Sequence, residues 1–263
     1  MQKTHYKKEL TINGILKNGE SGNEVKKVQE WLNLWRYIKP EWLSIISIDG
    51  DYGAQTKSAV MEFQQIHGLE TDGIAGPVTF GMLSSPLRNA FESIAGSSDL
   101  RALIVSYAKQ HLRNIPRELN SRNEGPWVRA YMDGNEGAPW AWCMGFVQTI
   151  LDQACNSVNQ NFTAIMPHSY SCDVVGSHGL SRNSLLRNEK IRNNPSQVQP
   201  GDIFLNVRTP HDWVHTGIIT GIQGDWFHTI EGNTNDEGSR EGFEVCKRMR
   251  NFMNHNMDVF KVN

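Results

Sequence analysis

Apolar residues recur at helical spacing in the first third of the chain. One group stands at positions i, i+3 and i+7, and a second group follows with compatible spacing, so each predicts a helix with a buried face. The two groups are Val25, Val28 and Leu32, and Ala59, Val60 and Phe63. Gly68 is expected to end the second helix, and a third short helix is expected over residues 77–83.

The rest of the chain carries both helical and strand patterns. Asp99 is suited to cap a helix that runs to about residue 112, and another helix is expected to begin close to Trp142. The apolar residues that follow Trp142 at helical spacing are Phe146, Val147, Ile150, Leu151 and Ala154. Three strands are predicted over residues 200–205, 213–220 and 226–234.

A turn motif, D-G-x-x-G-x-x-T, occurs twice in the first third, starting at Asp49 and at Asp72. Its two glycines can adopt the positive φ angles of tight turns, and its threonine can cap a following helix. We therefore interpret the Asp-Gly pairs as turn formers and not as ligand-binding residues.

Residues 18–84 resemble the peptidoglycan-binding-domain-1 family. The resemblance rests on both turn motifs and on Gly22, Val25, Val28, Gln29, Leu32, Ala59, Val60, Phe63, Gln64, Gly68 and Leu69. It implies a small three-helix module that holds bacterial peptidoglycan. Trp35, Trp42 and Tyr52 are candidates for an aromatic platform for saccharides, with core packing as the alternative for at least two of them.

Small polar residues at both ends of the stretch 84–99 predict a linker, although its middle could form a helical turn or two. The expected organisation is a wall-binding domain over residues 1–85, a linker over 86–99 and a second domain over 100–263.

Cys143 is the first candidate for chemistry in the second domain. It would lie in the first turn of the helix that begins near Trp142, where unpaired N–H groups and the helix dipole favour an anion. Such a position lowers a thiol pKa and produces a nucleophile. The alternative for Cys143 is a buried cysteine beside tryptophans.

Residues of the predicted strands can complete a catalytic set. Glu231 and Asn233 alternate along one strand and therefore share a face. If that face meets His215, the carboxylate or the amide can fix the imidazole tautomer and stabilise the imidazolium. Glu231 is our choice for this role, with Asn233 as its helper or substitute.

Residues 100–250 resemble the CHAP family, the cysteine, histidine-dependent amidohydrolases/peptidases. The matching residues are Trp142, Cys143, Phe146 and Val147, then Pro200 to Ile203, then His215, Gly217 and Ile218, then Glu231 to Asn233. The resemblance implies an α+β, papain-like (CHAP/NlpC-type) domain with an antiparallel sheet, and cleavage of an amide by a cysteine nucleophile. Trp142, next to that nucleophile, is expected to contact substrate. One departure is the Pro139-Trp-Ala-Trp-Cys143 stretch, because many relatives place Pro-Trp directly before the cysteine.

Charge and cysteine content narrow the alternatives. The chain has 26 Lys and Arg against 28 Asp and Glu, a formal net charge of −2, which argues against a nucleic-acid binder. Four cysteines in 263 residues, without paired CxxC spacing, indicate neither a disulfide scaffold nor a structural zinc site. Besides Cys143 they are interpreted as structural: Cys155, Cys172 and Cys246.

No apolar run approaches the roughly 18–20 residues that cross a bilayer, and no apolar segment follows the basic start of the chain. We therefore expect no membrane insertion and no secretory signal. The expected localisation is cytoplasmic synthesis, assisted release and action at the cell wall or periplasm, as a monomer.

Two metal sites are weighed against the thiol chemistry, which needs no metal or cofactor. A zinc site could combine His211 and His215 with His168 or Cys172, but a Pro-Asp loop does not align two such ligands as a helix would. The oxygen-rich stretch from Asp133 to Glu136 could bind calcium, with a solvated turn as the preferred interpretation. Residues 247–250 could touch an anionic polymer, with a solvated face preferred.

Taken together, the two resemblances imply a peptidoglycan hydrolase similar to a phage endolysin. It would act either as an N-acetylmuramoyl-L-alanine amidase or as a stem-peptide endopeptidase. The alternatives are a secreted antibacterial cell-wall toxin with the same chemistry, or a wall-binding or phage structural protein without catalysis.

Overall fold

The computed structural model describes residues 1–41, 44–235 and 242–262, which form two compact units. The first unit consists of Thr4–Asn89 and Arg117–Gly137, and the second of Met1–Lys3, Ala90–Pro116 and Ala138–Asn263. Neither unit is one continuous stretch of chain, because the backbone passes between them four times. The sequence-based division assigned residues 117–137 to the second domain, whereas here they group with the first unit.

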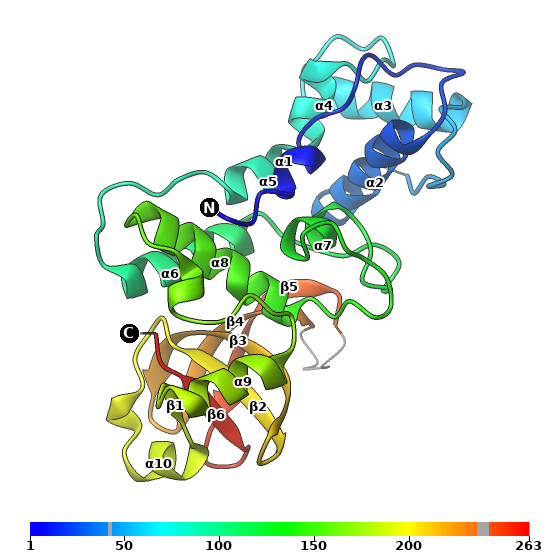
Figure 1. The fold of residues 1–263 in the computed structure, drawn as a ribbon. Helices are drawn as coiled ribbons and strands as arrows, with labels where there is room; N and C mark the ends of the chain where they lie inside the picture. The colour runs from blue at the N-terminus through cyan, green and yellow to red at the C-terminus, as the bar shows by residue number, and fades with distance from the viewer. Residues whose placement is uncertain (42–43, 236–241, 263) are drawn as a thin grey trace. The chain divides into compact units, whose positions relative to one another are not determined.

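The first unit is helical (Figure 1). The structure confirms the three helices expected from the sequence, two from apolar spacing and a third over residues 77–83. The helices of this unit are α1 (Tyr6–Glu9), α2 (Asn23–Ile38), α3 (Ala54–Ile66), α4 (Pro77–Leu83), α5 (Ser85–Ala90) and α7 (Pro126–Tyr131). The side chains of Val25, Val28, Val60 and Phe63 are fully buried, so the predicted apolar stripes do face one core.

Two glutamines organise the repeated turns of the first unit. The Gln29 amide nitrogen lies within hydrogen-bond distance of Asp49 Oδ1 (2.8 Å) and Thr56 Oγ1 (3.1 Å), and its Oε1 accepts from the amide of Gly50 (2.8 Å). Gln64 repeats the arrangement in the second turn, with Asp72, Thr79 and Gly73 as partners. The Asp-Gly pairs are therefore turn formers, as predicted from the motif.

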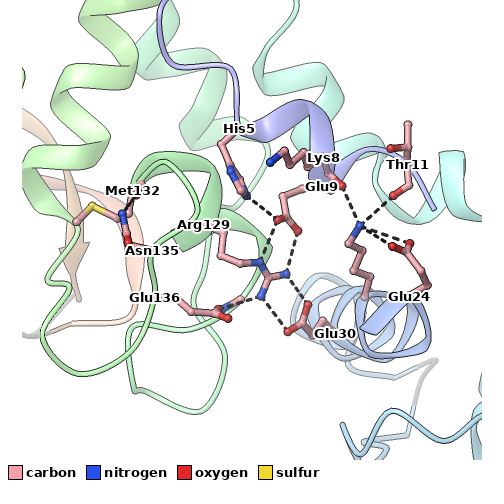
Figure 2. Close-up of polar contacts among 12 residues, drawn as sticks. His5, Lys8, Glu9, Thr11, Glu24, Glu30, Arg129, Met132, Asn135 and Glu136 are labelled. Atoms are coloured by element: carbon pink, nitrogen blue, oxygen red, sulfur yellow. Dashed lines mark hydrogen bonds and ion pairs between the residues drawn. The ribbon is translucent and has the colours of Figure 1, made fainter. Parts of the chain in front are cut away.

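Helix α7 packs against α1 and α2, and the partly buried Arg129 joins the three (Figure 2). The Arg129 guanidinium donates to Glu9 (2.9 Å) on α1 and to Glu30 (2.6 Å) on α2, and to Glu136 (2.9 Å) beyond α7. The Trp127 ring meets the Trp31 ring edge-on, with centroids 6.2 Å apart. These contacts explain why residues 117–137 belong to the first unit.

The second unit is built on one antiparallel sheet with helices packed against it (Figure 1). The strand order is β1-β6-β2-β3-β4-β5, and each of these neighbouring pairs is antiparallel. The strands are β1 (Leu185–Leu186), β2 (Ile203–Thr209), β3 (Asp212–Gln223), β4 (Trp226–Thr234), β5 (Glu244–Asn251) and β6 (Met257–Phe260). The α+β class with an antiparallel sheet is therefore confirmed.

The second unit contains both of the helices that were predicted for it from the sequence. Helix α6 (Leu100–Arg113) is capped by Asp99, whose side chain accepts from the amides of Arg101 and Ala102, and α8 (Cys143–Ser157) begins where the pattern places it. The remaining helices are η1 (Phe162–Ala164), α9 (Cys172–Ser181), α10 (Asn188–Asn193) and η2 (Pro195–Gln197). Helix α8 packs against α6, β3 and β4, while α9 packs against β3. The sheet thus brings the first turns of α8 and α9 towards the same strand.

The first three residues of the chain also belong to the second unit. The amides of Gln2 and Lys3 donate to the carboxylate of Asp152 on α8, and the buried Lys3 ammonium lies 3.2 Å from the Tyr170 hydroxyl. Nothing in the local sequence predicts this docking, because its partners lie about 150 residues away along the chain. Within the described residues, no helix combines the length and the hydrophobicity that spanning a membrane would require.

Candidate active site

Cys143 is the first residue of α8, at the end of the helix where backbone N–H groups have no acceptor within the helix. The Met144 amide interacts with the Cys143 sulfur, and the residue is only 6% exposed. Helix α8 is held on the sheet by close packing, since a Cβ on Gly232 of β4 would lie 2.7 Å from Phe146 Cβ. The nucleophile candidate is thus fixed on a rigid element.

His215 on β3 and Glu231 on β4 are directly hydrogen-bonded. The distance from His215 Nε2 to Glu231 Oε2 is 2.9 Å, and both side chains are almost fully buried. The other ring nitrogen, Nδ1, has no hydrogen-bond partner among the described residues, and an interaction with Cys143 raises the pKa of the ring. The three residues predicted from sequence therefore meet, with the imidazole between the thiol and the carboxylate.

Gly217 makes the pairing of His215 and Glu231 possible. A Cβ at this position on β3 would lie 2.6 Å from Glu231 Cγ and 2.8 Å from Phe204 Cε1. A larger residue would therefore displace the carboxylate from the imidazole. The spacing His215-x-Gly217 in the sequence reflects this close approach.

Arg250 on β5 and Thr229 on β4 fix the Glu231 carboxylate. Arg250 Nε donates to Glu231 Oε1 (2.8 Å), its Nη2 donates to Oε2, and the Thr229 hydroxyl donates to Oε1. Burial alone raises the pKa of Glu231, but the hydrogen bonds from Arg250 and His215 lower it to about 2. Glu231 is therefore ionised across the physiological pH range.

The electrostatics favour a charged thiol and imidazole pair. A hydrogen bond from Cys172, together with the interaction with His215, holds the pKa of Cys143 well below its usual value despite burial. Burial lowers the pKa of His215, but the contacts with Cys143 and Glu231 outweigh it and raise that pKa to about 9. Both shifts mean that the charged forms, a thiolate beside an imidazolium, are favoured.

Asn233 lines the same pocket as Cys143, whereas the hydrogen bond to His215 comes from Glu231. It has a left-handed backbone (φ 55°), it is 1% exposed, and its Oδ1 has no hydrogen-bond partner among the described residues. Glu231, and not Asn233, is the residue that contacts the imidazole. The amide of Asn233 instead faces a pocket of about 270 Å³ that Cys143 also lines. The other residues that line it are Ala141, Asp173, Arg208, Asp212, Trp213 and Val214.

Two of the aromatic residues predicted to contact substrate are buried and are therefore not available to it. Trp142 and Tyr52 are 0% and 1% exposed, and the Tyr52 hydroxyl donates to the Gly73 carbonyl. Packing therefore occupies both rings. Trp35 is half-buried against Phe63 and remains a candidate, while Trp42 lies outside the described residues.

The residues considered for metals are engaged in other contacts. Glu136, in the stretch considered for calcium, accepts hydrogen bonds from Arg129 and from the Gly125 amide. In the zinc alternative, His215 pairs with Glu231, and the His211 ring packs edge-on against Trp213. Across residues 1–41, 44–235 and 242–262, no three His, Cys, Asp or Glu side chains are grouped so that they could hold a metal ion.

Two residues of the site were missed by the sequence analysis. Cys172, interpreted there as structural, is the first residue of α9, and its interaction with Cys143 lowers the pKa of that thiol. Arg250 lies in the stretch 247–250 for which a solvated face was expected, yet it pairs with Glu231. Alternation along β5 is the only local signal for Arg250, and no local signal exists for Cys172.

Comparison with known proteins identifies part of the first unit. Residues 21–83 match the family PG_binding_1, described as "Putative peptidoglycan binding domain". The first unit contains a peptidoglycan-binding domain. The resemblance stated for residues 18–84 is thereby confirmed.

Individual relatives of the chain carry names of wall-acting enzymes. A "Zinc D-Ala-D-Ala carboxypeptidase" of Streptomyces albus G is 41% identical over 28% of this chain and 27% of the relative. A "Probable N-acetylmuramoyl-L-alanine amidase" of Bacillus licheniformis is 40% identical over 32% of this chain and 22% of the relative. The chain thus spans about a quarter of the length of these curated relatives.

Among solved structures, the crystal structure of the SleB N-terminal domain is similar in sequence over a comparable share of the chain. It is 32% identical and covers 29% of this chain and 96% of its own, with a TM-score of 0.25.

Proposed function

We propose that the protein is a peptidoglycan hydrolase that cleaves an amide bond of the bacterial cell wall by cysteine nucleophile acyl transfer. The observation that carries the proposal is the buried Cys143, His215 and Glu231 arrangement beside a pocket, in a chain that also contains a peptidoglycan-binding domain. The two named relatives, a carboxypeptidase and an amidase, support the substrate class. One of these relatives is named a zinc enzyme, whereas the mechanism that we propose uses only residues of this chain.

The first half of the reaction is acylation of the thiol. The Cys143 thiolate attacks the carbonyl carbon of the scissile amide, and the carbonyl oxygen becomes an oxyanion. The Cys143 backbone N–H, at the first position of α8, is free of any acceptor within the helix and donates to this oxyanion. The His215 imidazolium then gives its proton to the leaving amine, and a thioester remains on Cys143.

The second half of the reaction is hydrolysis of the thioester. His215, now neutral, takes a proton from water, and the resulting hydroxide attacks the thioester carbonyl. Glu231 holds Nε2 of the imidazole throughout, so that Nδ1 faces the sulfur and the imidazolium is stabilised. This chemistry also fits a papain-like, CHAP-type catalytic domain, which we propose for the second unit.

Purified peptidoglycan sacculi provide the direct test. We expect the protein to clear a suspension of sacculi, and we expect Cys143→Ala to abolish clearing while sacculus binding in a sedimentation assay persists. Cys155→Ala is the matched control, because Cys155 is also a buried cysteine of α8 but lies far along the helix from the pocket. Clearing by Cys143→Ala, or loss of clearing to a chelator alone, would contradict the thiol mechanism.

Mass spectrometry of the released fragments distinguishes the two candidate bonds. Cleavage of the bond between N-acetylmuramic acid and L-alanine releases intact stem peptides, whereas an endopeptidase leaves part of each peptide on the glycan. Binding without any released fragment would favour a wall-binding protein without catalysis.

A further inference from the structure

Two cysteines meet at the proposed nucleophile. Cys143 begins α8 and Cys172 begins α9, and Cys143 lines the same pocket as Asp173, the residue that follows Cys172. The interaction between the two thiols is also the largest influence on the pKa of each. They are 6% and 8% exposed, and none of the four cysteines is in a disulfide. The proposed acyl transfer uses only one of these thiols, so the second needs an explanation.

The position of Cys172 is fixed by the packing of α9 against the sheet. Asp173, the next residue, accepts a hydrogen bond from the Trp213 amide of β3 (2.6 Å). Gly176, one turn further along α9, lies so close to the Trp213 ring that a Cβ there would be 2.5 Å from it. Trp213 is fixed in turn by Asp258 on β6, which accepts from its indole N–H (2.9 Å). The first turn of α9 is therefore anchored to the same strand that carries His215.

The two thiols differ in the way that a reactive and a resolving cysteine differ. The hydrogen bond with Cys172 and the contact with His215 favour the thiolate of Cys143, while the same hydrogen bond and burial raise the pKa of Cys172 well above its usual value. A thiolate is the form that peroxides oxidise, and a neighbouring thiol then resolves the product. Cys143 also lines a pocket of about 270 Å³, which admits a molecule as small as a peroxide.

We propose that Cys143 and Cys172 are a reversible oxidative modification site, at which a peroxide converts the two thiols into a disulfide that blocks the nucleophile. In the first step the Cys143 thiolate attacks one oxygen of hydrogen peroxide, the O–O bond breaks, and Cys143 sulfenic acid and hydroxide form. In the second step the Cys172 sulfur displaces the sulfenic oxygen and its own proton leaves with that oxygen as water. Two thiols are oxidised, one peroxide is reduced, and two water molecules result once the hydroxide is protonated.

The disulfide would inhibit the proposed reaction and would also protect Cys143 from irreversible oxidation. Without a resolving thiol, a sulfenic acid is oxidised further to sulfinic and sulfonic acids, which thiol reductants do not reverse. With Cys172 as the neighbouring thiol, the disulfide forms first and a reductant such as dithiothreitol restores both thiols. The loss of activity rests on the proposed function, whereas the disulfide itself does not.

The test treats the full-length protein with hydrogen peroxide, blocks remaining thiols with iodoacetamide and maps the cysteines by mass spectrometry. We expect a peptide pair linked through Cys143 and Cys172 that is lighter than the two thiol peptides by two hydrogens. We also expect sacculus clearing to fall to the level of Cys143→Ala and to return to its starting level after dithiothreitol. Absence of the linked pair in the oxidised wild-type protein would overturn the proposal.

Two variants distinguish disulfide formation with Cys172 from oxidation of Cys143 alone. Cys172→Ser, checked for folding by circular dichroism, should form no link, should gain oxygen atoms at Cys143, and should not recover with dithiothreitol. Cys155→Ser, the matched control on α8, should form the link and recover like the wild type. Equal recovery of Cys172→Ser and wild type would also overturn the proposal. If no form clears sacculi but the link still appears, the proposed function fails while the modification site stands.

Discussion

At the scale of single residues, the proposed ion pair of Cys143 and His215 sets an upper pH limit for activity. The imidazolium that protonates the leaving amine exists only below the His215 pKa, which the contacts with Cys143 and Glu231, acting against burial, raise to about 9. We expect kcat/KM for sacculus fragments to be level through neutral pH and to fall as the pH rises through about 9. Glu231→Gln, which leaves Nε2 without a carboxylate, should lower this limit towards the ordinary histidine pKa and reduce the plateau. A Glu231→Gln profile that coincides with the wild-type profile would argue against the orienting role.

A second histidine, His111 on α6, couples stability to pH. It is fully buried, its Nε2 lies 2.7 Å from Gln153 Oε1, and burial lowers its pKa to about 4. Between about pH 6.5 and pH 4 the unfolded chain binds a proton that the folded chain does not, so the free energy of unfolding falls as the pH falls, by about 3 kcal/mol. Urea unfolding at pH 7 and pH 4.5 should show a smaller loss for His111→Gln than for the wild type. Equal losses in the two proteins would assign the pH dependence to other groups.

The sequence was sufficient for the residues whose roles depend on local pattern. Cys143 could be placed because it stands at the start of an apolar helical pattern, and Glu231 because strand alternation puts it on one face with Asn233. Cys172 could not be placed, because its contact with Cys143 depends on the packing of α9 against Trp213, about 40 residues further along the chain. The burial of Trp142 was missed for a similar reason, since Gly232 on β4 supplies the space that its ring fills.

At the scale of elements, the repeated turns of the first unit depend on their two glutamines. Gln29 connects α2 to the first turn, and Gln64 connects α3 to the second, each bonding a turn amide and a buried threonine hydroxyl. We expect Gln29→Ala and Gln64→Ala each to lower the free energy of unfolding by about 1–3 kcal/mol for every buried group left without a partner. Gln65→Ala, at an exposed neighbouring position, is the control and should have little effect in urea denaturation. A loss no larger than that of the control would show that water replaces these hydrogen bonds.

Elements marked by a local sequence signal were predictable, and elements that depend on tertiary contacts were not. The predicted third helix over residues 77–83 coincides with α4, and Asp99 caps α6 as expected. Helix α7 has only six residues, too few to be stable without tertiary contacts such as Trp127 against Trp31. Strand β1 has two residues and pairs with β6, so only the assembled sheet defines it.

At the scale of the whole molecule, the path of the chain decides how wall targeting can be tested. A deletion of residues 1–85 would remove Glu9 and Glu30 from Arg129, and Trp31 from Trp127. It would also remove Lys3, which is buried in the second unit. Loss of activity in such a deletion would therefore not distinguish missing binding from damaged structure.

A point substitution at Arg129 gives a sharper test of targeting. Arg129→Met leaves three carboxylates without their shared cation, and loss of one partner from a buried ion pair typically costs about 3–5 kcal/mol. Because all four side chains belong to the first unit, we expect this unit to unfold at lower urea concentration, with sacculus sedimentation weakened more than turnover of soluble wall fragments. Burial raises the pKa of Glu30, so acidification should protonate Glu30 and narrow the stability gap between variant and wild type. Arg88→Met, which removes an exposed arginine of the same unit, should change none of these measurements. Equal losses of sedimentation and of soluble turnover in Arg129→Met would refute a separate targeting role for the first unit.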